Sequence, residues 1–452
     1  MDPVTLTDLA RALDEGRIRG DGVTVTGAAI DSRRVRSGEL FVALAGERVD
    51  GHDFVAAART AGASAALVAR EVADALPQWV VPDPATTLAR LGAWVRAGVP
   101  ATVIGVTGSN GKTTVKEMLA AILGTGAETL ATEGNLNNFL GVPLTLCRLH
   151  RGQRFAVIEM GANAPGEIAG LAELAGPTIG IVTNAGPAHL SGFGNIEGVA
   201  RAKGEMFRGL PPDGVAVINA DDDHAPLWRE LAGTRRIVTF GTAESADVRV
   251  LPDHGERMRL ALPGGDEVSA ELALPGAHNR MNAAAAAAAS LAAGAPPAWI
   301  ERGLETVGGV AGRLARRRLA GGIELIDDSY NANPASVRAA VDLLAAGGGE
   351  CWLVLGDMGE LGEAAASLHA QTGTYAHKAG IARLFTCGEM ARTAAEAFGE
   401  GATHCPGLEA LVAALRRDLR PGVRVLVKGS RSAAMDRVVA ALTEGDDQGV
   451  GG

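Results

Sequence analysis

Short apolar runs alternate with longer stretches of helical apolar spacing along most of the chain. In its middle part, buried strands are predicted at Val103 and onward, Phe155–Ile158, Ile179–Val182 and Val215–Ile218, with helical or loop segments between them. A helix over about 86–97 precedes the first of these strands. Strands that alternate with helices favour an α/β fold with a mostly parallel sheet.

Two other parts of the chain flank this pattern. Residues 1–83 carry short apolar runs and one helical stretch over about 53–61, and they end at a linker-like Pro-Asp-Pro. After residue 312 the alternation starts again, with strands predicted at 323–326, 352–355, 384–386 and 423–428 and helices at about 335–345, 363–378 and 408–417. We therefore predict three domains, over 1–83, 84–312 and 313–452.

Two segments near the domain ends have a different character. Short alternating runs over about 237–274 predict an antiparallel addition to the central sheet, and an Ala-rich helix from Met281 to about Ala293 follows. The last stretch, Glu444–Gly452, is rich in Gly and Asp and predicts a disordered tail.

A glycine-rich turn follows the first central strand and leads into a helix. It reads Gly108-Ser109-Asn110-Gly111-Lys112-Thr113-Thr114, with two fewer residues between its glycines than the Walker A motif GxxxxGK[ST]. Gly108 and Gly111 let backbone N–H groups approach an anion, Lys112 can reach terminal phosphates, and the Thr113 hydroxyl can hold Mg²⁺. The alternative is a turn that only joins strand to helix. The strand, the helix and the Gly-Lys-Thr signature together favour a nucleotide-phosphate site.

Two further polar side chains follow central strands. Glu159 comes directly after Phe155–Ile158, and His189 ends the run Asn184-Ala-Gly-Pro-Ala-His189 after another buried strand. Parallel strands present their carboxyl ends at one edge of a sheet, so we expect both side chains near Thr113. Glu159 would be a second Mg²⁺ ligand, and His189 would have a metal or phosphate role. The alternatives are a solvated glutamate and a structural histidine.

The C-terminal part holds two more polar clusters at strand ends. One is Asp327-Asp328-Ser-Tyr330-Asn331-Ala-Asn333-Pro334, and the other is Lys428-Gly-Ser-Arg431. Helix capping would explain the first cluster, and a simple turn would explain the second. The number of polar groups in the first, and the planar donor fork of an arginine in the second, favour ligand binding instead.

Composition narrows the classes of protein that fit. Of the 452 residues, 47% are hydrophobic and 21% charged, as in folded globular chains, and the net charge of −10 argues against nucleic-acid binding. No apolar run is long enough for stable membrane insertion, and the acidic N-terminus lacks the features of a signal peptide, so a cytoplasmic location is expected. Cys147, Cys351, Cys387 and Cys405 form no CxxC pair, which predicts reduced, mostly buried thiols.

Taken together, these residues resemble the Mur ligases, the ATP-dependent amide-bond-forming enzymes of bacterial cell-wall synthesis. The matching stretches run in order through nearly the whole chain: 31–33, 38–54, 107–114, 134–143, 159–161, 184–189, 203–205, 276–282, 312–313, 328–334, 355–362 and 428–431. The narrower ones, Asn135-Leu-Asn-Asn138 and Gly356-Asp-Met-Gly-Glu-Leu-Gly362, favour substrates other than those of the diamino-acid-adding member of the family. They imply UDP-N-acetylmuramoyl-tripeptide and D-alanyl-D-alanine.

The resemblance implies a fold and a reaction. It implies a small α/β UDP-sugar-binding domain over 1–83, a central phosphate-loop ATPase domain with a mostly parallel sheet over 84–312, and a Rossmann-like ligase domain over 313–452. The γ-phosphoryl group of ATP would pass to the tripeptide carboxylate, and the dipeptide amine would then displace phosphate from the acyl phosphate. ATP and Mg²⁺ would be the cofactors, and the protein would act as a monomer on these two small molecules.

The resemblance also assigns roles to residues. Catalysis would involve Lys112, Glu159, His189 and Lys203, and the last three would hold metal together with Thr113. ATP would lie against residues 108–114 and against Asn282, Arg313, Asp328, Tyr330 and Asn331. Substrates would contact Ser32, Arg33, Gly46, Asp50 and His52 at the UDP end, and Asn137, Asn138, Asn333 and Arg431 at the amino-acid end. Family members carry the lysine at position 203 as a carbamate, which requires burial to lower its pKa.

One departure and three alternatives accompany this interpretation. Phe139 stands where many relatives place a polar residue, which does not change the class. The nearest alternative is another ligase of the same architecture, either a different Mur ligase or one of the folate-polyglutamate type. A phosphate-loop ATPase that drives a conformational switch would leave the Asp-Tyr-Asn cluster after residue 327 unexplained. A protein that only binds nucleotide would leave a metal site of Thr113 and Glu159 without a use.

Overall fold

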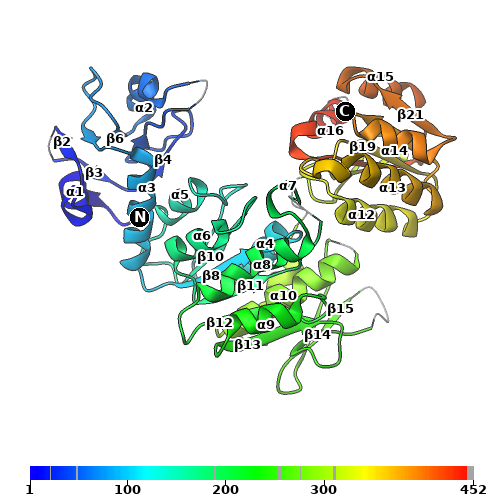
Figure 1. Cartoon of the computed structure of the whole chain (residues 1–452), viewed down its shortest axis with the longest axis horizontal. Helices are drawn as coiled ribbons and strands as arrows, with labels where there is room; N and C mark the ends of the chain where they lie inside the picture. Colours follow the sequence, from blue (N-terminus) through cyan, green and yellow to red (C-terminus); the bar gives the residue numbers. More distant parts are fainter. Residues whose placement is uncertain are drawn as a thin grey trace, which may run out of the picture.

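The computed structural model describes residues 1–20, 22–46, 49–187, 190–252, 257–274, 276–308 and 312–444. Three large sheets follow one another along these residues, and Figure 1 shows them as an N-terminal body at upper left, a middle body below and a C-terminal body at upper right. Each sheet is mostly parallel and has helices packed beside it. The predicted α/β class with three domains is confirmed, whereas the boundaries at residues 83 and 312 stay a prediction.

The N-terminal body is built on a sheet of order β2-β7-β6-β5-β4, in which only β2 is antiparallel to its neighbour. A separate antiparallel pair, β1 and β3, lies beside it. The elements of the N-terminal body are β1 (Val4–Thr5), α1 (Leu6–Leu13), β2 (Arg17–Arg19), β3 (Thr24–Val25), β4 (Ala28–Ala29), β5 (Leu40–Val42), a 3-10 turn η1 (Gly51–Phe54), α2 (Val55–Ala61), β6 (Ala65–Val68) and β7 (Gln78–Val80).

The next helix, α3 (Pro84–Ala97), joins the N-terminal and middle bodies. The Asp83 side chain accepts the Ala85 N–H and Pro84 occupies the first turn, so α3 begins two residues before the predicted start. Leu88 and Leu91 on α3 belong to the same buried cluster as Trp79 of β7 and Ile158 of the central sheet. The two bodies therefore share one hydrophobic core.

The middle body contains the sheet β16-β15-β14-β13-β12-β11-β8-β10-β9. Its elements are β8 (Thr102–Thr107), α4 (Lys112–Gly124), β9 (Thr129–Ala131), α5 (Gly141–Leu146), β10 (Phe155–Glu159), α6 (Glu167–Ala175), β11 (Ile179–Val182), α7 (Leu190–Phe193), α8 (Ile196–Arg208), β12 (Val215–Asn219), α9 (Ala225–Ala232), β13 (Arg236–Gly241), β14 (Val248–Val250), β15 (Met258–Ala261), β16 (Glu267–Ala270), α10 (Ala277–Ala292) and α11 (Pro297–Thr306). Buried residues of α4, α10 and α11 cover one face of the sheet, and those of α3, α6, α8 and α9 cover the other.

The antiparallel addition predicted over 237–274 is wrong in its first half. Strands β13 and β14 pair in parallel, and only β15 and β16 are antiparallel to their neighbours. Strand β13 follows the crossover helix α9, and a strand that returns through a helix joins the sheet in parallel. The alternation of apolar residues is the same in both kinds of pairing, so it did not distinguish them.

The C-terminal body has the sheet order β17-β18-β22-β19-β20-β21, with only β17 antiparallel to its neighbour. Its elements are β17 (Ala315–Arg318), η2 (Ala320–Gly322), β18 (Glu324–Asp328), α12 (Pro334–Ala346), β19 (Cys351–Gly356), η3 (Gly362–Ala364), α13 (Ala365–Lys378), β20 (Arg383–Cys387), α14 (Ala391–Phe398), β21 (Ala402–Cys405), α15 (Leu408–Asp418), β22 (Arg424–Lys428), η4 (Arg431–Ala433) and α16 (Asp436–Thr443). Helices lie on both faces of the parallel strands, as expected for a Rossmann-like arrangement.

The state of the cysteines agrees with the sequence. All four cysteines are free, and Cys147, Cys351 and Cys405 are buried. Within the described ranges, no helix is both long enough and apolar enough to cross a bilayer.

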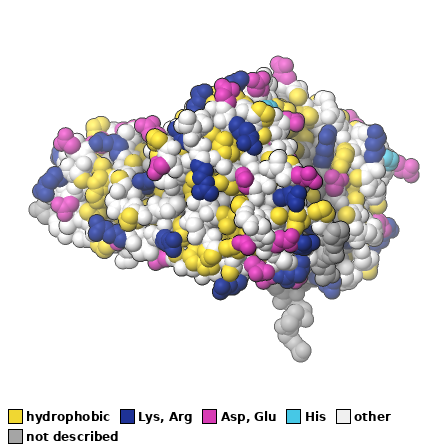
Figure 2. Space-filling model, turned by 90° about the horizontal axis from the view of Figure 1, so that it is seen from below, with side chains coloured by type: hydrophobic (Ala, Val, Ile, Leu, Met, Phe, Trp, Pro, Cys, Tyr) yellow, Lys and Arg dark blue, Asp and Glu magenta, His cyan; other side chains and the backbone are white. Residues whose placement is uncertain are grey.

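Basic and acidic side chains are interspersed over the face shown in Figure 2. The tail predicted from residue 444 onward lies, apart from Glu444, outside the described residues.

Candidate active site

A cavity of about 1220 Å³ is lined by residues of both the middle and the C-terminal bodies. Its lining residues follow β8, β10 and β11 on one side and β18, β19 and β22 on the other, and helix α10 contributes a further wall. These are carboxyl ends of parallel strands, where open α/β sheets place their ligands. Two separate sheets therefore contribute loops to one site.

The phosphate loop is held in shape by its neighbours. Gly108 has φ +145° and Gly111 has φ +82°, a region that favours glycine. A Cβ atom on Gly111 would lie 2.3 Å from Asn282 Oδ1, and one on Gly108 would lie 1.9 Å from Thr183 Oγ1. Glycine is therefore required at both positions for steric as well as conformational reasons.

Strand β11 and its following loop fix the other side of the phosphate loop. The Ser109 N–H donates to Asn184 O at 3.0 Å, and the Asn110 N–H donates to Asn184 Oδ1 at 3.0 Å. Thr183 Oγ1 donates to Asn110 O at 2.6 Å. The sequence indicated the stretch that begins at Asn184 but gave neither Thr183 nor Asn184 a role, because their contacts are with residues about 75 positions away.

Lys112 folds back over its own loop. Its Nζ donates to Gly108 O at 2.7 Å and to Ser109 O at 3.2 Å. Burial lowers the pKa of Lys112, the positive charge of Arg313 lowers it further, and the negative charge of Glu159 opposes both effects. A phosphate oxygen would be a stronger partner for this ammonium than two carbonyl groups.

Glu159 presents a buried carboxylate at the end of β10. Its Oε1 accepts from Asn137 Nδ2 at 2.8 Å, whereas Oε2 is buried and has no hydrogen-bond partner within the described part of the chain. A buried carboxylate oxygen without a donor is costly unless a cation compensates it. A Mg²⁺ ion needs only one or two protein oxygens when phosphates and water complete its shell, so Glu159 with the Thr113 hydroxyl fits such an ion.

The remaining predicted metal ligands are placed differently. His189 lies outside the described residues. Lys203 on α8 is 2% exposed, its Nζ donates to Ala162 O at 3.2 Å, and it lies 5.2 Å from the centre of the Phe193 ring. Burial, assisted by the charge of Lys112, lowers the pKa of Lys203 to about 7. Its amine is thus far easier to deprotonate than that of a surface lysine.

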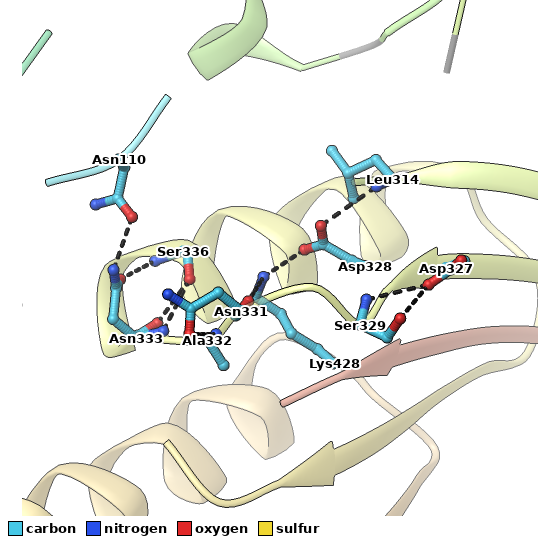
Figure 3. Close-up of polar contacts among 10 residues, drawn as sticks. All are labelled: Asn110, Leu314, Asp327, Asp328, Ser329, Asn331, Ala332, Asn333, Ser336 and Lys428. Carbon is cyan, nitrogen blue, oxygen red and sulfur yellow. Dashed lines mark hydrogen bonds and ion pairs between the residues drawn. The ribbon is translucent and has the colours of Figure 1, made fainter. Parts of the chain in front are cut away.

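Two side chains of the C-terminal body reach the phosphate loop directly. Arg313 Nη2 donates to Thr113 Oγ1 at 2.9 Å, and its guanidinium lies 4.5 Å from the centre of the Tyr330 ring. Asn333 Nδ2 donates to Asn110 Oδ1 at 2.7 Å, a contact drawn in Figure 3. The sequence predicted Arg313 near ATP but assigned Asn333 to an amino-acid substrate. In the structure the Asn333 side chain is bonded to the phosphate loop.

The polar cluster after β18 is partly helix-capping and turn chemistry (Figure 3). Asp327 accepts from Ser329, and Asp328 pairs with Lys428 and accepts the Leu314 N–H at 3.2 Å. Lys428 Nζ also donates to Asn331 O at 2.9 Å. These bonds fix the loop that carries Tyr330 and Asn331 into the cavity lining.

The predicted residues of the N-terminal body do not line this cavity. Arg33 makes two bonds of 2.9 and 2.8 Å to the Asp31 carboxylate, and these lower the pKa of Asp31 to about 2. His52 is bonded through Nδ1 to Asp50 at 2.6 Å and accepts the Ala69 N–H at Nε2, so both ring nitrogens have partners. Hydrogen bonds from the His52 N–H and then from Arg70 lower the pKa of Asp50.

Other predicted residues have local roles or line the cavity. Ser32 and Gly46 lie outside the cavity lining, and the Gly46 N–H donates to Val49 O at 2.9 Å. Asn137, Asn138 and Arg431 line the cavity, and Asn138 Oδ1 also accepts the Gly141 N–H at the start of α5. The cavity lining beside the phosphate loop includes Ser109, Asn110, Thr114 and Asn282.

No pattern in the sequence indicated a role for Lys116. This residue on α4 is 1% exposed, and its Nζ donates to Thr132 O at 2.7 Å and pairs with Glu117. Thr132 Oγ1 in turn accepts the Glu159 N–H at 3.0 Å. A lysine in a helix is ordinarily a surface residue, so only its burial in the structure reveals this support for Glu159.

The fold and the site define a phosphate-loop, nucleotide-dependent enzyme whose site is completed by a Rossmann-like body. Three family models match the chain: "Mur ligase family, catalytic domain" over residues 24–121, "Mur ligase middle domain" over 106–290, and "Mur ligase, glutamate ligase domain" over 312–431. The chain belongs to the Mur ligase family and is an ATP-dependent ligase.

Individual relatives match over almost the full length. The UDP-N-acetylmuramoyl-tripeptide–D-alanyl-D-alanine ligase of Escherichia coli K12 is 45% identical over 451 residues, which cover 98% of this chain and 99% of that protein. A crystal structure of MurF from Acinetobacter baumannii is 36% identical with a TM-score of 0.88, over 98% of this chain and 99% of that one. MurF of Thermotoga maritima in complex with ADP is 27% identical with a TM-score of 0.79, over 94% and 98% of the two chains.

Proposed function

We propose that this ligase joins D-alanyl-D-alanine to UDP-N-acetylmuramoyl-tripeptide, with ATP converted to ADP and phosphate. The observation that carries the proposal is one cavity lined both by loops of the C-terminal body and by Lys112 and Glu159, whose Oε2 has no hydrogen-bond partner among the described residues. Such a cavity can hold a triphosphate on one side and an acceptor on the other. The full-length relative from Escherichia coli, at 45% identity, carries the name of this reaction.

ATP would bind against the phosphate loop. The N–H groups of that loop and Lys112 would neutralise the phosphates, and Arg313 would leave Thr113 for the phosphoryl group. Asn282, Asp328, Tyr330 and Asn331 would surround the rest of the nucleotide. Thr113 and Glu159 would hold one Mg²⁺, with His189 and Lys203 at a second, and bound Mg²⁺ would supply charge neutralisation during phosphoryl transfer.

The first chemical step would make the tripeptide carboxylate reactive. Its oxygen attacks the γ-phosphorus and ADP leaves, which gives an acyl phosphate with a far better leaving group than hydroxide. Lys112 and Arg313 would neutralise the charge that accumulates on the phosphoryl group, and loops of the C-terminal body would exclude water that could otherwise hydrolyse the intermediate. The amine of the dipeptide then displaces phosphate and forms the amide.

Lys203 would act as a carbamate. Carbon dioxide adds only to a neutral amine, and the buried amine of Lys203, with a pKa of about 7, is partly neutral at physiological pH. We expect ¹³C-bicarbonate to give a carbamate NMR signal that the Lys203→Ala variant lacks and that the exposed Lys378→Ala variant retains. Turnover should be lost in Lys203→Ala and partly restored by a short carboxylic acid. Full activity of that variant would reject the role.

The other assignments complete the proposal. The domain over 1–83 would bind the UDP part, the domain over 84–312 would bind ATP, and the domain over 313–452 would bind the acceptor. The UDP end would be contacted by Ser32, Arg33, Gly46, Asp50 and His52. Asn137, Asn138, Asn333 and Arg431 would contact the amino-acid parts. A cytoplasmic monomer stays the expected state.

Phosphate release tests the function directly. Purified protein with ATP, Mg²⁺ and UDP-N-acetylmuramoyl-tripeptide should release phosphate rapidly only when D-alanyl-D-alanine is added, and the pentapeptide product should appear in equal amount. A Lys112→Met variant serves as the inactive control. Phosphate release that ignores the dipeptide would support a switch-type ATPase, and release that requires a different amino acid would support another ligase of this architecture.

A further inference from the structure

The loop after β19 belongs to the stretch Gly356-Asp-Met-Gly-Glu-Leu-Gly362, to which no role has so far been given. Met358 and Leu361 are 2% and 3% exposed and belong to the core of the C-terminal body. Glu360 stands between these two anchors, and it lines the cavity. The loop thus fixes its apolar residues inside and presents a carboxylate to the site.

Three hydrogen bonds hold this loop, and a fourth fixes the histidine ring that accepts one of them. The Met358 N–H donates to His369 Nε2 at 2.8 Å, and the Nδ1 of the same ring is bonded to Ala365 O at 2.7 Å. Asp357 accepts the Ser430 N–H at its carbonyl oxygen at 2.9 Å and the Ala391 N–H at Oδ1 at 2.7 Å. Bonds to helix α13, to the start of α14 and to the loop after β22 leave the backbone around Glu360 little freedom.

The backbone of Glu360 is strained. Its φ is +61°, in the left-handed region that a side chain with a Cβ atom adopts at a cost of about 1–2 kcal/mol. Glycine would adopt this conformation without that cost, as its neighbour Gly362 does at φ +58°. Such strain at a cavity wall is typical of residues retained for their side chain. Glu360 is exposed overall, and partial desolvation at the cavity wall raises its pKa, which makes its carboxylate a better proton acceptor.

A cation faces the same part of the cavity from the next loop. A Cβ atom on Gly359 would lie 3.5 Å from Ser430 Cβ, so Glu360 and Arg431 follow two residues that are in contact. Both line the cavity on the C-terminal side, and Arg431 is 69% exposed, with its Nη1 3.8 Å from Asp436 Oδ2. A carboxylate and a guanidinium on adjacent loops complement the ammonium and carboxylate of a free amino acid or short peptide.

We propose that Glu360 is a catalytic residue of the acceptor site, where it binds the ammonium group of the incoming zwitterionic dipeptide and accepts its proton, while Arg431 binds the dipeptide carboxylate. This inference rests on the proposed ligase function. An N–H bond of the ammonium breaks and the proton passes to the Glu360 carboxylate. The freed electron pair forms the C–N bond to the acyl carbon. The C–O bond to phosphate then breaks, and phosphate leaves with the electron pair of that C–O bond and takes up the second amine proton. Glu360 returns its proton to water.

The test compares two nucleophiles on the Glu360→Gln variant. Hydroxylamine is largely unprotonated at neutral pH, so it can capture the acyl phosphate as a hydroxamate without an ammonium site or a base. We expect kcat/KM for D-alanyl-D-alanine to fall about 100-fold or more, the range of general acid–base contributions, while hydroxamate formation stays within about threefold of wild type. Glu363→Gln, an exposed residue of the same segment outside the cavity lining, is the matched control and should behave as wild type.

A second variant separates chemistry from folding. Glu360→Gly relieves the positive φ, so its thermal midpoint should equal or exceed that of wild type while dipeptide-dependent activity is lost. Equal losses with dipeptide and hydroxylamine, or undiminished dipeptide activity in Glu360→Gln, would overturn the role of Glu360. Wild-type protein without dipeptide-dependent phosphate release would instead reject the ligase function, so the two failures are distinct.

Discussion

The phosphate loop and the predicted UDP end of the site obtain their hydrogen bonds from different distances along the chain. Around the phosphate loop, Asn110 is bonded to Asn184 and to Asn333, which lie 74 and 223 positions away. In the N-terminal body, Asp31 is bonded to Arg33 and Asp50 to His52, in each case two positions away. One region is assembled from two bodies of the fold, and the other is bonded within a single body.

This difference indicates how each region would accept a ligand. Backbone N–H groups and Lys112 at the phosphate loop await an anion, and residues from two bodies keep the loop shaped for it. In the N-terminal body the charges are already paired, so a bound diphosphate would have to replace Asp31 as the partner of Arg33. The backbone of the first region is preorganised, and only the side chains of Lys112 and Arg313 would exchange partners there. In the second region the predicted ligand would replace the partner of Arg33 itself.

The largest predicted effect breaks the phosphate loop at one of its two close contacts. In Gly111→Ala, the new Cβ atom would meet Asn282 Oδ1 at 2.3 Å in a backbone conformation with φ +82°. We expect kcat/KM for ATP to fall by about 100-fold or more, as when positioned catalytic donors are lost. Gly124→Ala at the other end of α4 is the control, because nothing lies within 4 Å of its Cβ position. Similar kinetics for the two variants would contradict a tightly fitted loop.

A smaller effect on activity is expected from Lys116, which supports Glu159 of the proposed Mg²⁺ site. Lys116→Met removes the donor to Thr132 O, and Thr132 holds the Glu159 N–H. We expect about tenfold more Mg²⁺ to be needed for half-maximal activity, since about 1.4 kcal/mol of ligand positioning corresponds to that factor. Glu117→Gln, which removes only the 40%-exposed partner of Lys116, should change little. An unchanged Mg²⁺ titration would show that Lys116 serves stability alone.

The hydrogen bond from Asn333 to Asn110, which joins the C-terminal and middle bodies, can be removed while helix α12 keeps its N-cap. In Asn333→Asp, the side chain still accepts the Ser336 N–H that caps α12, now bonded at 2.9 Å, but it no longer donates to Asn110. We expect ATP affinity measured by calorimetry to fall by about five- to tenfold, the value of one hydrogen bond, with little change in thermal midpoint. Asn333→Ala should lower both quantities. If Asn333→Asp bound ATP as well as wild type, the contact would not contribute to the nucleotide site.

The smallest effects on activity are expected in the N-terminal body, where charges pair within one body. The Arg33 side chain is 86% exposed, so Arg33→Ala should leave the free energy of unfolding nearly unchanged while KM for the UDP substrate rises. His52→Ala should cost about 1–3 kcal/mol, because His52 is buried and supplies the acceptor for the Ala69 N–H. An unchanged KM in Arg33→Ala would place the UDP-binding residues elsewhere.

The fold could be predicted wherever the apolar pattern was strong. The strand Ile179–Val182 is a short apolar run, and the helix over 408–417 has apolar residues at the helical period of 3.6. Such predictions require one of these patterns. Strand β17, with the sequence Ala-Arg-Arg-Arg, has no apolar signal and was not predicted. It is specified by its antiparallel partner β18, which is a tertiary contact rather than a local preference.

The candidate site divides in the same way. Lys112, Thr113 and Glu159 could be proposed because strand ends and a glycine turn have local signatures. The bond from Arg313 to Thr113 joins residues 200 positions apart, and the burial of Lys116 depends on packing that no short pattern encodes. The strain at Glu360 lies in its backbone φ, and a glutamate between Gly359 and Leu361 does not by itself predict a positive φ.

Helix α10 places an evolutionary constraint on the enzyme. It buries the unbroken alanine run Ala283–Ala289, and it packs against α4 and against strands of the central sheet. Alanine loses no rotamer freedom on burial, and its small size allows this close approach. Directly before the run stands Asn282, which lies against Gly111. A larger residue within the run would displace Asn282, so natural variation there would be limited by ATP binding even though these alanines lie outside the cavity lining.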